Sequence, residues 1–201
     1  MSGTVLTKTY CEPPVSERDI LRYAGARDAD AEVRDLLRSC LDEARDKLVY
    51  RVCYREVTVK TEGEFCDLGA LRVASRDLAL HLDGCERAIL FAATVGLELD
   101  RLIAKYGRLS PARALMLQAI GAERIEALCD AFCAELAREH RTTARFSPGY
   151  GDLPLSCQRD LFAVLDCERR LGLTLTDSLL MLPTKSVTAI VGIGQLQMPP
   201  K

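Results

Sequence analysis

One short segment, ARFSPGYGDLPLSCQ from Ala144 to Gln158, contains residues whose chemistry suits ligand binding. Arg145 carries a planar guanidinium that can bond both oxygens of a carboxylate. Gly149 has no side chain to keep a ligand from backbone N–H and C=O groups, and Pro148 restrains the turn. Tyr150 offers an aromatic face to a purine ring or a cation. Together they suit a ligand with an amino-acid end, a positive centre and a nucleoside end.

The same residues also have a plain structural interpretation. Gly, Pro, Ser and Asp are the usual residues of turns, and turn statistics account for every Gly and Pro in the segment. Residue chemistry alone therefore favours a structural turn that carries a salt-bridged Arg145. A ligand site needs support from the rest of the chain.

The apolar pattern along the chain predicts the elements that hold this turn. Apolar residues at intervals of three and four predict amphipathic helices, and dense β-branched or apolar runs predict strands. The predicted helices are 16–23, 31–48, 75–82, 99–107, 110–139 and 156–171, and the predicted strands are 49–60 and 87–96. The segment TEGEFCDLG between them is expected to be a turn. Gly121 is a candidate bend in the long helix.

Three serines are expected to cap helices. Ser16 followed by Asp19 resembles a capping box, and Ser75 begins a short helix that ends at 83–84. Ser110 is expected to cap the long helix with its hydroxyl, with Pro111 at the first helical position.

The last forty residues change in character. LTLTDSLLMLPTKSVTAIVGI contains two β-rich runs joined around Pro183 to Lys185, which predicts a β-hairpin or two neighbouring antiparallel strands. Mixed helices and strands without regular βαβ alternation predict an α+β fold, with an antiparallel or mixed sheet, a long central helix and flanking helices. No linker divides the chain, so residues 1–201 are expected to form one domain.

Composition excludes several classes of protein. The 201 residues carry 29 acids and 27 bases mixed along the chain, so there is no basic field for a nucleic acid backbone. No stretch approaches the ~18 apolar residues of a membrane span, and the first residues do not resemble a signal peptide. Nine scattered cysteines without a CxxC spacing indicate reduced thiols. We therefore expect a cytoplasmic protein without nucleic-acid or membrane partners.

The signatures of most catalytic sites are missing from the sequence. It has no GxGxxG after a strand, no GxxxxGK[ST] and no GxSxG. Its two histidines, His81 and His140, are interpreted as structural residues. Cys129 and Cys133 lie four apart on a predicted helix, yet no four-ligand metal cluster is apparent. We expect no catalytic residue and no metal on this chain.

A family resemblance adds to this interpretation. RFSPGYGD, with a helix after it and then LGLTLTDSLLMLPTKSVTAIVGI, resembles the activation domain of cobalamin-dependent methionine synthase. That domain carries an R-x-x-x-G-Y motif in its S-adenosylmethionine site, which corresponds to Arg145, Gly149 and Tyr150. The resemblance is strongest over 110–195, and the long N-terminal part of the family's domain has no obvious match in this sequence. The chain length suits small free-standing relatives of that domain.

The resemblance implies roles for particular residues. Arg145 would hold the methionine carboxylate of S-adenosylmethionine, and the backbone at Ser147 and Gly149, with Tyr150, would hold the adenosine. A family acidic residue that contacts the amino end of the ligand corresponds to Glu126. Glu123, on the same predicted helix, competes for that role.

The resemblance also implies partners. The family's domain docks over a cobalamin-bearing domain, where an electron from a flavodoxin-type donor and a methyl group from S-adenosylmethionine restore methylcobalamin. This sequence lacks the D-x-H-x-x-G loop that ligates cobalt, with Ala79 in LALHLDG where the Asp would stand, so cobalamin is expected on a partner protein. Lys185 replaces a small residue of the family and is either an ordinary hairpin lysine or a cation near the site.

The resulting hypothesis is a protein that binds S-adenosylmethionine and acts in trans in the reductive activation of a cobalamin-dependent methyltransferase. Two alternatives stay open. The first is a docking or assembly module for corrinoid proteins that has lost ligand binding, in which Arg145 pairs with a carboxylate of its own chain. The second is a methyltransferase that uses S-adenosylmethionine on a small molecule, although the sequence lacks a glycine-rich nucleotide loop.

Overall fold

The centre of the molecule is a five-stranded antiparallel sheet with the order β1-β2-β6-β10-β7. The computed structural model describes residues 3–194. The sheet strands are β1 (Leu6–Tyr10), β2 (Tyr50–Thr58), β6 (Arg87–Thr94), β7 (Arg141–Thr142) and β10 (Ser186–Gly194). The predicted α+β class with an antiparallel sheet is confirmed.

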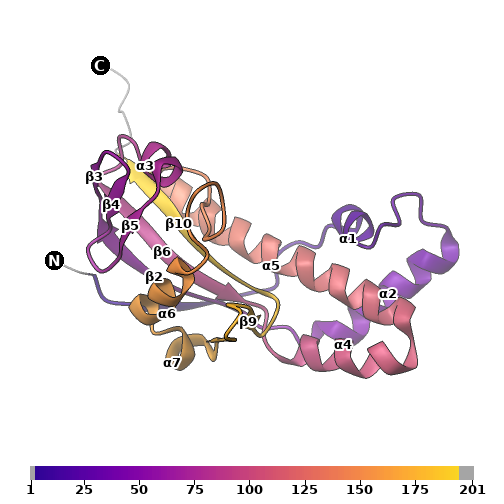
Figure 1. Ribbon diagram of the computed structural model, residues 1–201. Helices are drawn as coiled ribbons and strands as arrows, with labels where there is room; N and C mark the ends of the chain where they lie inside the picture. The colour runs from indigo at the N-terminus through magenta and orange to yellow at the C-terminus, as the bar shows by residue number, and fades with distance from the viewer. Residues whose placement is uncertain (1–2, 195–201) are drawn as a thin grey trace, which may run out of the picture.

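One face of the sheet is covered by the long helix α5 (Pro111–Glu139). Figure 1 shows that the C-terminal half of α5 lies along the sheet, while its N-terminal half extends away from it. There it packs against α1 (Glu17–Tyr23), α2 (Ala31–Arg45) and α4 (Glu98–Leu109). Alternate residues of the central strands, including Phe91 on β6, point into this apolar layer.

The other face is covered by three short helices and a small sheet. The helices are α3 (Arg76–His81), α6 (Cys157–Leu165) and α7 (Cys167–Leu171), and the small sheet consists of β3 (Lys60–Glu62), β4 (Phe65–Asp67) and β5 (Arg72–Ala74). Leu90 and Ile190 of the central strands pack into this second apolar layer. The sheet is therefore buried on both faces.

Local helix signals were accurate at two of the three predicted caps. The Ser16 hydroxyl accepts from the Asp19 N–H at 3.3 Å, and the Ser75 hydroxyl accepts from the Leu78 N–H at 3.0 Å. Ser110 makes no side-chain cap bond, so its predicted role as a capping hydroxyl is wrong and Pro111 alone marks the start of α5.

Predictions that depended on distant partners were less accurate. The predicted hairpin around Pro183 to Lys185 is wrong, because β8 (Thr174–Leu175) pairs with β9 (Met181–Leu182) while β10 pairs with β6. Pairing with β6 on one side and β7 on the other places the apolar β10 inside the main sheet, where its side chains are buried. The cis peptide Leu182–Pro183 lies between β9 and β10.

Other boundaries also differ from the prediction. The helix predicted over 156–171 breaks at Asp166, whose φ of 52° separates α6 from α7. The segment TEGEFCDLG contains the end of β3 and all of β4 as well as turns. Helix α4 continues past Gly107 to Leu109, and β1 was not predicted at all. These elements are short or exposed, and pairing with neighbours rather than local pattern determines them.

Gly121 allows a close approach of two segments to α5, which is continuous through this residue. A Cβ at this position would lie 2.6 Å from Leu99 Cδ2 and 2.8 Å from Lys185 Cγ. Lys185 therefore lays its stem across α5 at the start of β10, and is not a hairpin lysine. Burial lowers the pKa of its ammonium, and Asp100 opposes that effect.

None of the helices within residues 3–194 combines the length and the apolar character that crossing a membrane requires.

Candidate functional site

The glycine-rich loop continues the edge of the main sheet where β7 ends. Phe146 and Ile190 of β10 exchange two backbone hydrogen bonds, at 2.9 and 2.8 Å. Beyond this bridge the Tyr150 N–H donates to the Ser147 carbonyl at 3.0 Å, and the Gly149 N–H donates to the Leu153 carbonyl at 2.9 Å. The φ of +90° at Gly149 is one that side chains rarely allow. The loop is therefore fixed by its own backbone.

Helix α3 fastens the far side of the loop. The Asp152 carboxylate accepts from the Arg76 N–H at 2.8 Å, from the Asp77 N–H at 3.2 Å and from the Ser75 hydroxyl. The Ser75 hydroxyl and these N–H groups lower the pKa of Asp152. In return the Asp152 N–H donates to Asp77 Oδ2 at 3.2 Å. The loop is thereby bonded directly to the N-terminus of α3.

Gly151 lies at this junction. Its φ is +51°, and a Cβ there would lie 2.1 Å from Asp77 Oδ2. The positive φ favours glycine, and a larger residue would also force the Asp77 side chain to move.

Arg145 projects from the loop onto α5. Its Nη2 donates to Glu126 Oε2 at 2.9 Å and to Asp130 Oδ1 at 2.9 Å. Burial disfavours its charge, yet its pKa is raised because Cys129, Glu126 and Asp130 are close to the guanidinium. The salt-bridged arginine of the plain structural interpretation is thus present. The geometry also brings together Arg145 and Glu126, which the resemblance had assigned to one site.

Glu123, which competed with Glu126 for the predicted contact, is held differently from Glu126. Its carboxylate is buried and accepts from Arg124 Nη2 at 2.6 Å, Arg124 Nε at 2.5 Å and the Ser16 N–H at 2.9 Å. Arg124 is fully buried and also donates to the carbonyls of Pro13 and Pro14, each at 2.7 Å. Glu123 therefore anchors the N-terminal segment, whereas Glu126 faces the loop.

The buried Arg124 was not recognised from the sequence, although a signal was present. Arg124 lies four residues after Ile120 and four before Leu128, on the buried side of the helix. A charged residue in that register needs a buried partner.

A groove runs along α5, between the acids Glu126 and Asp130 and helix α1. On α5 the groove is lined by three small side chains and three acids: Ala127, Ala131, Ala134, Glu123, Glu126 and Asp130. Across from them lie Pro13, Pro14, Ser16, Asp19, Arg22 and Tyr23. The charges of Asp19 and Arg22 offset each other through a 2.9 Å ion pair, so the α5 wall leaves the groove acidic.

The loop exposes the aromatic ring of Tyr150, while Ser147 is half-buried. The Tyr150 side chain is 58% exposed, and its ring lies edge-on to Phe146 with centroids 6.1 Å apart. Within residues 3–194, no group accepts a hydrogen bond from the Ser147 N–H. His81 supports this platform, because its Nε2 lies 2.8 Å from the Ala144 carbonyl and its ring lies 5.0 Å from that of Phe146. An exposed aromatic ring and a backbone N–H without an acceptor therefore lie on one loop.

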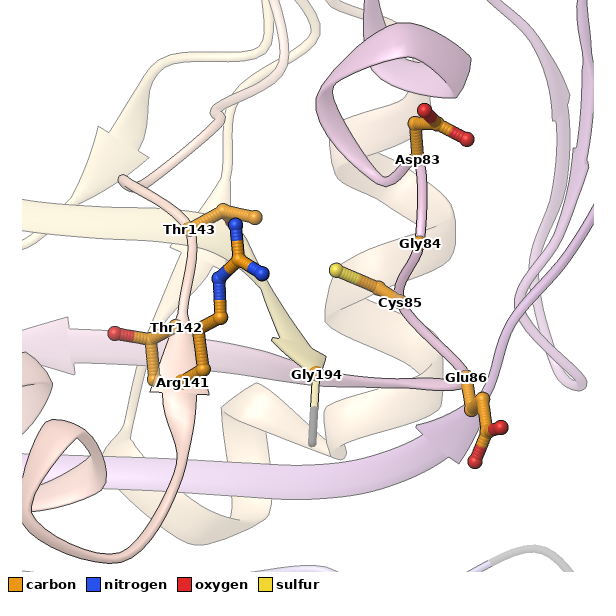
Figure 2. Close-up of a pocket in the computed structure, with 8 residues that line it drawn as sticks. All are labelled: Asp83, Gly84, Cys85, Glu86, Arg141, Thr142, Thr143 and Gly194. Carbon is orange, nitrogen blue, oxygen red and sulfur yellow. The ribbon is translucent and has the colours of Figure 1, made fainter. Parts of the chain in front are cut away.

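A second hollow lies at the end of the sheet, and none of the residues predicted for the site lines it. Figure 2 shows Cys85 and Arg141 pointing toward one another across it, while Asp83 and Glu86 point away. Burial raises the pKa of the Cys85 thiol, and the nearby Arg141 opposes that effect. In the part of the chain that the structure describes, no group of three or more His, Cys, Asp or Glu side chains could hold a metal ion.

Comparison with known proteins identifies the class of fold. Residues 130–195 match the family model described as the activation domain of vitamin B12 dependent methionine synthase. The matched segment includes the whole RFSPGYGD loop, and the sequence resemblance is confirmed there. No curated protein matches the sequence.

The structure extends that likeness beyond the matched segment. A crystal structure of the MetH reactivation domain bound to AdoHcy aligns with a TM-score of 0.66 and 16% identity, over 98% of this chain and 80% of that chain. At this identity the likeness establishes the fold. The alignment includes residues 1–109, so this part of the chain shares the architecture of that domain as well.

Proposed function

We propose that this protein binds S-adenosylmethionine between the 145–150 loop and α5. The observation that carries the proposal is the contact of Arg145 with Glu126 beside an exposed aromatic loop, on the fold of a domain whose crystal structure contains AdoHcy. The methionine carboxylate would bond to Arg145, and the ligand's ammonium would bond to Glu126. The adenosine would lie on Tyr150, with the backbone at Ser147 and Gly149 as its polar contacts.

The charge of the site supports the same ligand. S-adenosylmethionine carries a sulfonium and an ammonium against one carboxylate, so its net charge is positive. Two acids face one arginine at the loop, and the groove beside them is acidic. Opposite charges attract a ligand to a partly enclosed surface more strongly than to open water.

The protein would then act in trans on a cobalamin-bearing methyltransferase, with residues 1–201 as one functional domain. Cobalamin on the partner would supply a cobalt nucleophile for the sulfonium methyl, with an electron from a flavodoxin-type donor. This chain's share would be to orient the methyl donor and to exclude water. His81 of this chain contacts the Ala144 carbonyl and the Phe146 ring, which agrees with a cobalt ligand that belongs to the partner protein.

A second candidate function also has an observation in its favour. Arg145 already bonds two carboxylates of its own chain, as a docking or assembly module without ligand binding would require. Such a module would form a complex with a corrinoid protein and yet bind no S-adenosylmethionine.

Calorimetric titration of S-adenosylmethionine separates the two candidates. Wild type should bind, and Arg145→Ala should lose about tenfold or more in affinity, because a charge-assisted hydrogen bond contributes roughly 1.5 to 3 kcal/mol. Arg141→Ala is the matched control, since this arginine lines the hollow of Figure 2 and not the loop. Circular dichroism checks that each variant is folded. Absence of binding up to millimolar ligand, with a corrinoid partner added, would contradict the proposal.

A further inference from the structure

One nitrogen of Arg145 serves two carboxylates that differ in exposure. Nη2 lies 2.9 Å from both Glu126 Oε2 and Asp130 Oδ1. The Glu126 side chain is 44% exposed, whereas that of Asp130 is 73% exposed. Solvent screens an exposed ion pair, and ordering an exposed side chain costs entropy. Asp130 is therefore the partner that Arg145 releases more readily.

We propose that Asp130 occupies the position on Arg145 that the carboxylate of the ligand takes, and so sets the affinity for ligands with an amino-acid end. This inference rests on the proposed function. In the bound protein the ligand's carboxylate replaces Asp130 on Nη2, and Asp130 moves into solvent. Glu126 stays at the site, where it faces the ligand's ammonium.

The two acids then have opposite effects on binding, although they bond the same nitrogen at the same distance. Replacing Glu126 removes a contact to the ligand, so Glu126→Gln weakens binding. Replacing Asp130 removes a competitor, so Asp130→Asn tightens binding. If both acids only held the guanidinium in place, loss of either would weaken binding.

A general electrostatic effect would not produce the tighter binding expected of Asp130→Asn. The ligand is a net cation, so removing an acid from the surface lowers its attraction to the protein. Glu139→Gln measures that background, because Glu139 is exposed on the same helix and lies nine residues, about 13 Å, beyond Asp130. A tightening specific to Asp130→Asn therefore reports competition for Arg145.

The test is calorimetry of wild type and the three variants with two ligands. The first is S-adenosylmethionine, and the second is methylthioadenosine, which keeps the adenosine and the sulfur but lacks the amino-acid end. We expect Asp130→Asn to lower the Kd for S-adenosylmethionine about two- to fivefold, the range that an exposed ion pair contributes, and to leave the Kd for methylthioadenosine unchanged. Glu126→Gln should raise the Kd for S-adenosylmethionine, and Glu139→Gln should not lower it.

Several results would overturn the inference. Unchanged or weaker binding by Asp130→Asn would do so, as would an equal gain for methylthioadenosine or in Glu139→Gln. These outcomes leave the proposed function standing as long as wild type binds S-adenosylmethionine. Failure of wild type itself to bind would contradict the proposed function, and with it the role of Asp130.

Discussion

Gly151→Ala tests whether α3 fixes the loop that carries the proposed site. An alanine at the φ of +51° enters the left-handed region, which costs a side-chain-bearing residue about 1 to 2 kcal/mol. The new Cβ would also lie 2.1 Å from Asp77 Oδ2 and 3.0 Å from Asp77 Cβ, so Asp77 must move. That movement breaks its 3.2 Å bond from the Asp152 N–H, which adds about 0.5 to 1.5 kcal/mol.

Gly172→Ala is the matched control for the backbone cost. Gly172 has a φ of +71°, and a Cβ there meets nothing within 4 Å. The free energy of unfolding of Gly151→Ala should therefore be about 0.5 to 1.5 kcal/mol lower than that of Gly172→Ala. Urea unfolding followed by circular dichroism measures this difference, which corresponds to a Tm lower by about 1 to 6 °C.

The Asp77→Ala background isolates the cause. Without the carboxylate, Gly151→Ala and Gly172→Ala should differ far less in unfolding free energy. If Gly151→Ala is no less stable than Gly172→Ala, or if its deficit persists in the Asp77→Ala background, the bond from the Asp152 N–H to the Asp77 carboxylate does not stabilise the loop.

Three further predictions concern buried and titrating groups. Arg124→Met alone should lower the free energy of unfolding by about 3 to 5 kcal/mol, because it leaves the Glu123 carboxylate buried without its cation. Adding Glu123→Leu should restore part of the loss. Urea unfolding of the single and the double variant tests both expectations. Burial raises the pKa of the Cys129 thiol to about 12, so a maleimide at neutral pH should label the exposed Cys11 and leave Cys129 unmodified, as peptide mass spectrometry would reveal. The pKa of Asp152 is lowered from 3.8, so the stabilisation by its carboxylate is present above pH 3.8 and is lost as the pH falls below it. In acid unfolding experiments, the free energies of unfolding of wild type and Asp152→Asn should therefore converge below that pH. A difference in stability that stays constant with pH would contradict the assignment.

The sequence predicted well those elements that local chemistry determines. Ser16 and Ser75 begin helices through bonds to residues three positions on, and the apolar run of β6 is buried on both faces as its composition requires. The exposed β1 has no such local signature. It exists through its pairing with β2, forty or more residues away in the chain.

In the candidate site, too, the local sequence indicates some residues, whereas distant contacts determine the position of others. Arg145, Gly149 and Tyr150 lie in one loop, and a motif could indicate them. Glu123 and Glu126 are three residues apart on one helix, so the sequence alone could not decide which of them faces the loop. The N-terminal segment decides it, because its Pro13 and Pro14 carbonyls hold Arg124 and thereby Glu123 in the core.

The central claim is that S-adenosylmethionine binds between the loop and α5, and amide NMR of the labelled protein during titration tests it most directly. The account predicts saturable shifts at Ser147, Gly149 and Tyr150 and on α5 around Glu126. Shifts confined to the residues of the hollow in Figure 2, or none at millimolar ligand, would contradict it.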